Sequence, residues 1–203
     1  MIAGLDHVVL VVLDLERAVA DHRTRGFTVI PGGVHAGGLT HNALVGFADG
    51  SYLELIAFAD LERARGTHRW APVAERGGGW ADFALLSSDL TQDVAALGEL
   101  VARPPEDAGR TRPDGLRIAW RAAGLVPPLP FLIEDLTARE LRVPGGEAAR
   151  HANGVRGVER VLVGAREPRI TADRYATLRG RGAPEVEVRQ APRDGVVEVR
   201  FAR

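Results

Sequence analysis

The sequence predicts an α+β fold in which paired βαβββ modules form a curled mixed sheet around a cup, followed by a third partial βαββ unit at the C-terminus. The first observation is an internal repeat, because residues 4–15 (GLDHVVLVVLDL) align with residues 79–90 (GWADFALLSSDL). The second is that the ends of the two copies also align, with 51–58 (SYLELIAF) over 129–136 (LPFLIEDL). A titratable side chain on the first and last strands of each copy indicates a shared polar cup.

The first predicted module covers residues 1–58. Its opening segment, 3–12, is rich in Val and Leu and is typical of a buried strand. Asp14 caps the helix that follows, and Gly26 ends it. Three further strands complete the module, the last two joined by an Asp49-Gly50 turn, and we expect them at 27–30, 39–48 and 51–58.

The second predicted module covers residues 79–136 and begins after a charged connector at 59–78. A strand is followed by a helix capped by Ser88 or Asp89, and Pro104-Pro105 is expected to stop that helix. The segment 105–113 is a weak strand candidate. Clearer strands follow at 115–123 and 129–136.

The third predicted unit covers residues 154–203, after a linker at 137–153. A strand at 157–165 precedes a helix at 171–180 capped by Thr171. Polar and apolar residues alternate in two segments, 185–191 and 196–202. This pattern predicts a β-hairpin with one face exposed to solvent. Capping an exposed sheet edge is one physical reason for such a unit.

Composition narrows the classes of partner. The chain has 203 residues, 45% of them hydrophobic, which is enough for a substantial core. The net charge of −1 gives no general attraction to nucleic acid or to anionic membranes. There is no cysteine, no signal-peptide pattern and no apolar run long enough to span a bilayer. We expect a cytoplasmic protein with a small-molecule ligand and neither a nucleic-acid nor a membrane partner.

Two side chains carry the site prediction. His7 is flanked by Val and Leu in a buried strand, and Glu54 lies between Leu53 and Leu55. A buried carboxylate must be paired, coordinated or protonated, because an isolated buried charge costs several kcal/mol. A metal ion would satisfy Glu54, and so would one of the many arginines. For His7 the alternative is a buried imidazole bonded to a backbone carbonyl.

Further residues are candidates for contact with a substrate. Thr40, His41 and Asn42 form a polar group between two predicted strands, where they either orient a substrate or take part in ordinary turn chemistry. The aromatic residues Trp120 and Phe131 either line an apolar wall of the cup or belong to the core.

The chain resembles the vicinal oxygen chelate superfamily, and within it the glyoxalase-like domain proteins of bacteria. The segments that carry the resemblance are GLDHVVLVVLDLERAVA (4–20), GGLTHNALVGF (37–47) and SYLELIAF (51–58). The match is specific in the first module and looser in the second.

The resemblance implies a divalent metal (Fe, Mn, Ni, Mg or Zn) held by side chains from the first and last strands of each module. Carried over by position, the ligands are His7, Glu54, Asp82 and Glu134. It also implies that Glu54 or Glu134 shuttles a proton. Asp82 is a departure, since a histidine is more usual there, and the alternative is a surface residue near a strand start.

Three functions follow as hypotheses. The first is a metal-dependent lyase, isomerase or dioxygenase-type enzyme acting on a small oxygenated substrate. The second is a metal-free small-molecule binding protein of the drug-sequestering kind, and the third is a structural or partner-binding role. The repeat leaves open whether the cup forms within one chain or between the chains of a homodimer.

Overall fold

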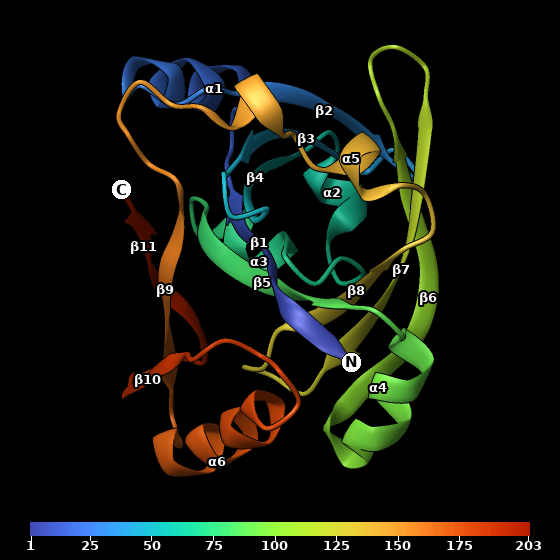
Figure 1. Cartoon of the computed structure of the whole chain (residues 1–203), viewed down its shortest axis with the longest axis vertical. Helices are drawn as coiled ribbons and strands as arrows, with labels where there is room; N and C mark the ends of the chain where they lie inside the picture. Colours follow the sequence, from blue (N-terminus) through green and yellow to red (C-terminus); the bar gives the residue numbers. More distant parts are fainter.

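Eight strands close into a barrel around the predicted cup (Figure 1). The computed structural model describes all residues, 1–203. The order around the barrel is β1-β4-β3-β2-β6-β7-β8-β5, and β5 pairs back with β1, so the cup forms within a single chain. The strands are β1 (Ile2–Val11), β2 (Ile30–His35), β3 (Thr40–Gly46), β4 (Tyr52–Phe58), β5 (Gly79–Ser87), β6 (Val101–Thr111), β7 (Arg117–Leu125) and β8 (Phe131–Asp135). The predicted fold class is confirmed.

Each module carries one main helix after its first strand. Helix α1 (Leu15–Thr24) begins after Asp14, whose carboxylate accepts a hydrogen bond from the Arg17 amide at 2.9 Å. Helix α4 (Leu90–Leu97) begins after Asp89 with the matching bond from the Gln92 amide. The same capping chemistry therefore fixes the start of both helices.

Two strand predictions differ from the structure. A strand was expected at 27–30, but β2 begins at Ile30 and runs through Pro31, Gly32 and Gly33. Gly32 leaves room for Asn42 Oδ1 on the neighbouring strand, where a Cβ would clash. β6 runs through Pro104 and Pro105, which lie where its register with β7 shifts, so no ladder donor is needed there. Helix α4 instead ends at Gly98, which has φ +51°, and a 3₁₀ turn (Gly98–Leu100) leads into β6.

The C-terminal unit contains β9 (Gly157–Ala165), α6 (Pro168–Arg179), β10 (Glu187–Gln190) and β11 (Gly195–Ala202). The predicted hairpin is wrong, because β10 and β11 both pair with β9, which lies between them. The most apolar of the three strands takes the central place, and the alternating ones take the edges. The closed barrel leaves no edge to cap, so the unit instead packs on its outer face, with Phe201 against Trp80.

Successive side chains of a barrel strand point alternately outward and inward, and this alternation produces two apolar clusters, one outside the barrel and one inside it. Val8 faces outward into the larger cluster, which joins the barrel to α1, α4, α6 and the C-terminal sheet. Val9 faces inward with Phe131 and Ile133. Short elements lie between the modules and after β8, namely α2 (Leu61–Ala64), α3 (Ala71–Glu75), α5 (Arg139–Arg142) and a 3₁₀ turn (Gly146–Ala149).

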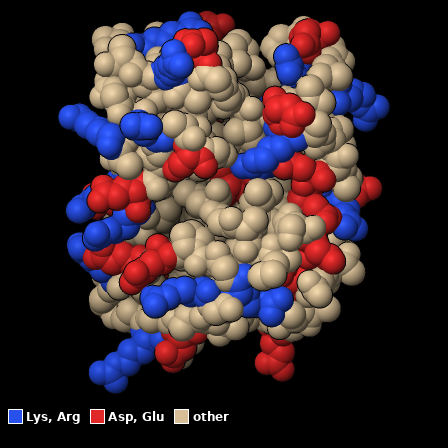
Figure 2. Space-filling view, viewed as in Figure 1, with Lys and Arg blue, Asp and Glu red and all other residues tan.

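The outer surface shows no strong charge separation on the face seen in Figure 2, where acidic and basic side chains are interspersed around an uncharged centre. No helix combines the length and the apolar character that crossing a membrane requires.

Candidate functional site

A cavity of about 230 Å³ lies inside the barrel. One part of its lining is polar and comes mainly from the first module. The other part is apolar and comes mainly from the second module and the connector between the modules. The polar lining includes His7, His35, Thr40, Tyr52, Glu54 and Arg110, and the apolar lining includes Ile56, Trp70, Trp120, Phe131 and Ile133.

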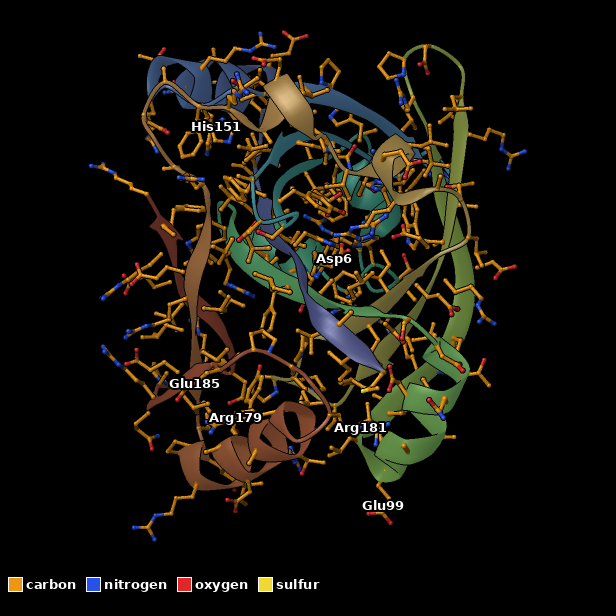
Figure 3. All side chains as sticks on the ribbon, viewed as in Figure 1. Asp6, Glu99, His151, Arg179, Arg181 and Glu185 are labelled. Carbon is orange, nitrogen blue, oxygen red and sulfur yellow. The ribbon has the colours of Figure 1, made fainter.

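A bulge in β1 orients His7. Leu5 pairs with Leu85 and His7 with Ala84, so Asp6 is an extra residue on β1. The bulge brings the Asp6 carboxylate within 2.5 Å of His7 Nδ1, and both side chains are buried. A carboxylate at Nδ1 keeps a proton on that nitrogen, so Nε2 presents its lone pair to the cavity. Figure 3 shows Asp6 inside the ring of strands.

Glu54 lies beside His7 on the cavity wall, because β4 pairs directly with β1. Its Oε2 is 3.7 Å from His7 Nε2, too far for a hydrogen bond. Its Oε1 accepts a hydrogen bond from Asn42 Nδ2 at 2.5 Å, and His35 Nε2 lies 3.5 Å away. Thr40 Oγ1 in turn contacts His35 Nδ1 at 2.9 Å. One carboxylate oxygen is therefore fixed by Asn42, while the other faces His7 across a gap.

Burial keeps His35 neutral. Burial lowers the pKa of His35, and the positive charge of Arg110 acts in the same direction, although Glu54 partly opposes both. The side chain is a neutral imidazole at pH 7.

An ion-pair network behind His7 joins the two modules. Arg142, on α5, is 1% exposed and donates to Asp6 at 2.7 and 2.9 Å, to Asp135 at 2.5 Å, and to the Tyr52 hydroxyl at 2.8 Å. Arg139 also pairs with both carboxylates. Burial alone would raise the pKa of Asp6, but the hydrogen bonds from Arg142 and His7 outweigh it and hold that pKa well below its usual value. Asp6 therefore stays ionised behind His7.

The connector between the modules supplies part of the apolar lining. His68 and Trp70 reach the cavity from the segment between α2 and α3. Arg69 lies over the Phe131 ring, with its Cζ 4.7 Å from the centroid, and pairs with Asp82. The pKa of His68 falls to about 4, mainly because of burial, and the nearby charge of Arg69 acts in the same direction.

Asp82 does not lie with the other predicted ligands. The residue paired with His7 on β5 is Ala84, and Asp82 pairs with Val9, two residues further along. Its carboxylate pairs with Arg69 and accepts hydrogen bonds from the Trp70 indole N–H and the Phe83 amide. The alignment of the repeats missed this offset because both strands are similarly apolar.

Glu134 and His41 also lie outside the cavity. The inward residues of β8 are Phe131 and Ile133, so Glu134 faces the other side, where it pairs with Arg121 at 2.5 Å and accepts from the Leu90 amide of α4. A one-residue difference in phase reverses the face of a strand. His41 alternates with Thr40 and Asn42 on β3 and, unlike Thr40, does not line the cavity.

The sequence matches the profile described as the glyoxalase-like domain over residues 5–179. The chain belongs to the glyoxalase-like domain family. The fold and the family together make it a member of the vicinal oxygen chelate superfamily, as the resemblance indicated. A comparison with curated protein sequences found no match.

Solved structures share the fold of this glyoxalase-like protein. A hypothetical protein from Staphylococcus aureus is 14% identical with a TM-score of 0.74, over 94% of this chain and 87% of that one. A single-residue variant of the Streptomyces coelicolor methylmalonyl-CoA epimerase, in complex with 2-nitronate-propionyl-CoA, is 24% identical with a TM-score of 0.51, over 68% of this chain and 100% of that one. A methylmalonyl-CoA epimerase with methylmalonyl-CoA and NH4⁺ is also 24% identical, with a TM-score of 0.51, over 68% and 97%.

The residues of this glyoxalase-like protein do not fit the four-ligand metal set. Only His7 and Glu54 of that set line the cavity, and Asp82 and Glu134 are paired with arginines outside it. No group of three or more His, Cys, Asp or Glu side chains is arranged to hold a metal ion. Arg110, a cation, also lines the cavity.

Several residues of the site were not predicted as site residues, namely Asp6, His35, Tyr52, His68, Trp70, Arg110 and Arg142. Asp6 could have been predicted, because it is a second polar residue, next to His7, in an apolar strand. Arg110 lies in a segment predicted as a weak strand, and Arg142 lies in a predicted linker. Nothing in the sequence distinguishes these two arginines from the many others.

Proposed function

We propose that this chain is an enzyme that moves a proton to and from carbon on a small oxygenated molecule, with Glu54 and His7 as its paired acid and base. The observation that carries the proposal is the 3.7 Å gap between Glu54 Oε2 and His7 Nε2 in the lining of the barrel cavity. Both atoms bear lone pairs, and each has its other polar atom held, by Asn42 and by Asp6.

The chemistry balances as a proton transfer. Glu54 Oε2 takes a proton from a carbon next to a carbonyl, and the C–H electron pair moves to the carbonyl oxygen as an enolate. The same proton returns to carbon either directly from Glu54 or from His7 Nε2 after it has passed from Glu54 to that lone pair, and the enolate electron pair re-forms a C–H bond to give an isomer or epimer. Positioned acid–base groups of this kind contribute about 10²–10⁴-fold to a rate.

The proposal selects among the hypothesised reaction classes. Isomerases need only proton transfer. Lyases begin with the same proton abstraction and then expel a leaving group, so both classes share the proposed first step. The dioxygenase class needs a redox-active metal, and the donor set described above does not provide a site for one. The epimerases with this fold belong to a class of enzymes that inverts a stereocentre. This supports proton transfer at carbon as the proposed reaction.

The test is hydrogen exchange at carbon. The protein and Glu54→Gln are incubated in D2O with pyruvate, 2-oxobutanoate, phenylpyruvate and acetoin, and loss of the α-proton signal is followed by NMR. We expect the protein to accelerate exchange of at least one probe, and Glu54→Gln to lower that rate about 100-fold or more. Glu99→Gln is the matched control, because Glu99 is exposed and lies at the outside of the molecule (Figure 3).

A second candidate is a metal-free small-molecule binding protein, and the aromatic lining of Trp70, Trp120 and Phe131 favours it. Equal exchange by the protein and by Glu54→Gln, together with unchanged ligand binding, would support this function and contradict the enzymatic one. The barrel closes within one chain, so neither function requires the homodimer, which stays a prediction.

A further inference from the structure

Two arginines are buried at the cup, and they differ in their partners. Arg142 pairs with two carboxylates. Arg110, on β6, is 5% exposed, yet no carboxylate oxygen lies within 4.0 Å of its guanidinium. Its Nη2 donates to the backbone carbonyl of Arg142 at 2.8 Å, and its Nε has no partner. Arg110 is thus a buried cation whose hydrogen-bonding capacity is largely unused.

Such a group is costly unless something pairs with it. A guanidinium stays charged in proteins and carries five donors that match a carboxylate in a bidentate arrangement. Burial of a charge without a partner is strongly unfavourable. Glu54 faces the same cavity but is held by Asn42 rather than by Arg110. The free donors of Arg110 therefore indicate an anionic group on the ligand.

We propose that the cavity binds a small carboxylic acid, whose carboxylate pairs with Arg110 and whose apolar part lies against Trp120 and Phe131. The position of the reacting carbon next to Glu54 rests on the proposed function, whereas the carboxylate site rests on Arg110 alone.

The size of the cavity limits the ligand. A volume of about 230 Å³ corresponds to roughly eight water molecules in the liquid. It lies below the range of about 300–1,000 Å³ that is usual for sites of drug-sized ligands. The cavity therefore suits a small acid with one aromatic or branched group better than a whole coenzyme A ester.

The test compares a carboxylate with its neutral amide. Phenylacetate and phenylacetamide have nearly the same shape, and each is titrated by calorimetry into the full-length protein. We expect phenylacetate to bind about 10- to 100-fold more tightly, because a charged bidentate contact is lost in the amide. Arg110→Met should weaken phenylacetate by about the same factor and leave phenylacetamide within about twofold. The matched control is Arg117→Met, since Arg117 is exposed on the adjacent strand.

Two outcomes would overturn the proposal. The first is equal binding of the acid and the amide by the unaltered protein, and this comparison needs no variant, so it holds even if Arg110→Met fails to fold. The second is undiminished binding of phenylacetate by a folded Arg110→Met protein. Glu54→Gln separates this proposal from the proposed function, because it should abolish exchange at carbon while keeping the preference for phenylacetate.

Discussion

The two halves of the cup have the same strand arrangement but different chemistry. The first module turns polar side chains inward, and the second turns apolar ones inward. Both modules carry a glutamate on their last strand, yet Glu54 faces the cavity and Glu134 faces α4. The inward residues of the first module include the polar His7, Asn42, Glu54 and, on β2, His35, beside the apolar Val9 and Ile56, whereas those of the second include Ala84, Trp120, Phe131 and Ile133.

This difference shows that a duplicated barrel need not share its site evenly. A four-ligand metal site would need inward donors from both modules. Here the first module supplies His7, His35 and Glu54, and the second supplies an apolar wall and the cation Arg110. A ligand with one charged end and one apolar part fits a cup of this kind.

The largest effect is expected from breaking the link between the halves. Arg142 contacts Asp6 of the first module and Asp135 of the second. Arg142→Met leaves the buried Asp6 with Arg139 and His7, and leaves the half-buried Asp135 with Arg139. Removal of one partner from a buried pair costs about 3–5 kcal/mol. We expect a loss near the lower end of that range in the free energy of unfolding, measured by urea denaturation.

The pH dependence of that loss has a defined sign. The pKa of Asp6 is depressed in the folded protein, so its stabilisation is present above the unfolded value of about 3.9 and disappears as the pH falls through the folded value. The difference between the protein and Arg142→Met should therefore shrink in acid. The control is Arg112→Met, where an exposed pair with Asp114 is lost at a cost of about 1 kcal/mol or less. Equal losses in the two variants would contradict the role of Arg142.

A second prediction addresses the apolar wall. Phe131 is 6% exposed and contacts His7 edge-on, with ring centroids 5.4 Å apart. Phe131→Ala should cost about 3 kcal/mol, the lower part of the range for buried aromatic truncation, because the ring already borders a cavity. It should also weaken phenylacetate binding. Phe201→Ala, on the outer sheet, should destabilise the protein but leave binding unchanged, and an equal effect on binding would show that Phe131 acts only through stability.

The predictions from sequence succeeded for features that repeat along the chain. They failed for side chains whose position depends on which face of a strand they occupy. The sequence showed the duplication, the apolar strands and the aspartate caps of both helices. These three features predicted the βαβββ modules. The inward placement of His7 and Glu54 followed from polar residues in apolar strands. The placement of Asp82 and Glu134 depends on strand offsets of one or two residues, which an alignment of two weakly similar copies does not resolve.

The smallest effect concerns His68, which reaches the cavity from the connector between the halves. Its pKa falls to about 4 in the folded protein, against about 6.5 when unfolded. The unfolded chain therefore binds more protons between these values, so stability rises with pH across that window and is lost as the pH falls from about 6.5 to about 4. His68→Gln should flatten this slope by less than one proton, that is by less than about 1.4 kcal/mol per pH unit, because His68 is only half-buried.

Urea denaturation of the protein and of His68→Gln at a series of pH values measures the two slopes. The curves should run parallel above about pH 7, where His68 is neutral in both the folded and the unfolded chain. They should diverge below that, because only the unaltered protein must take up a proton at His68 on unfolding. Curves that stay parallel down to about pH 4 would show that His68 is accessible to water rather than enclosed by the cup.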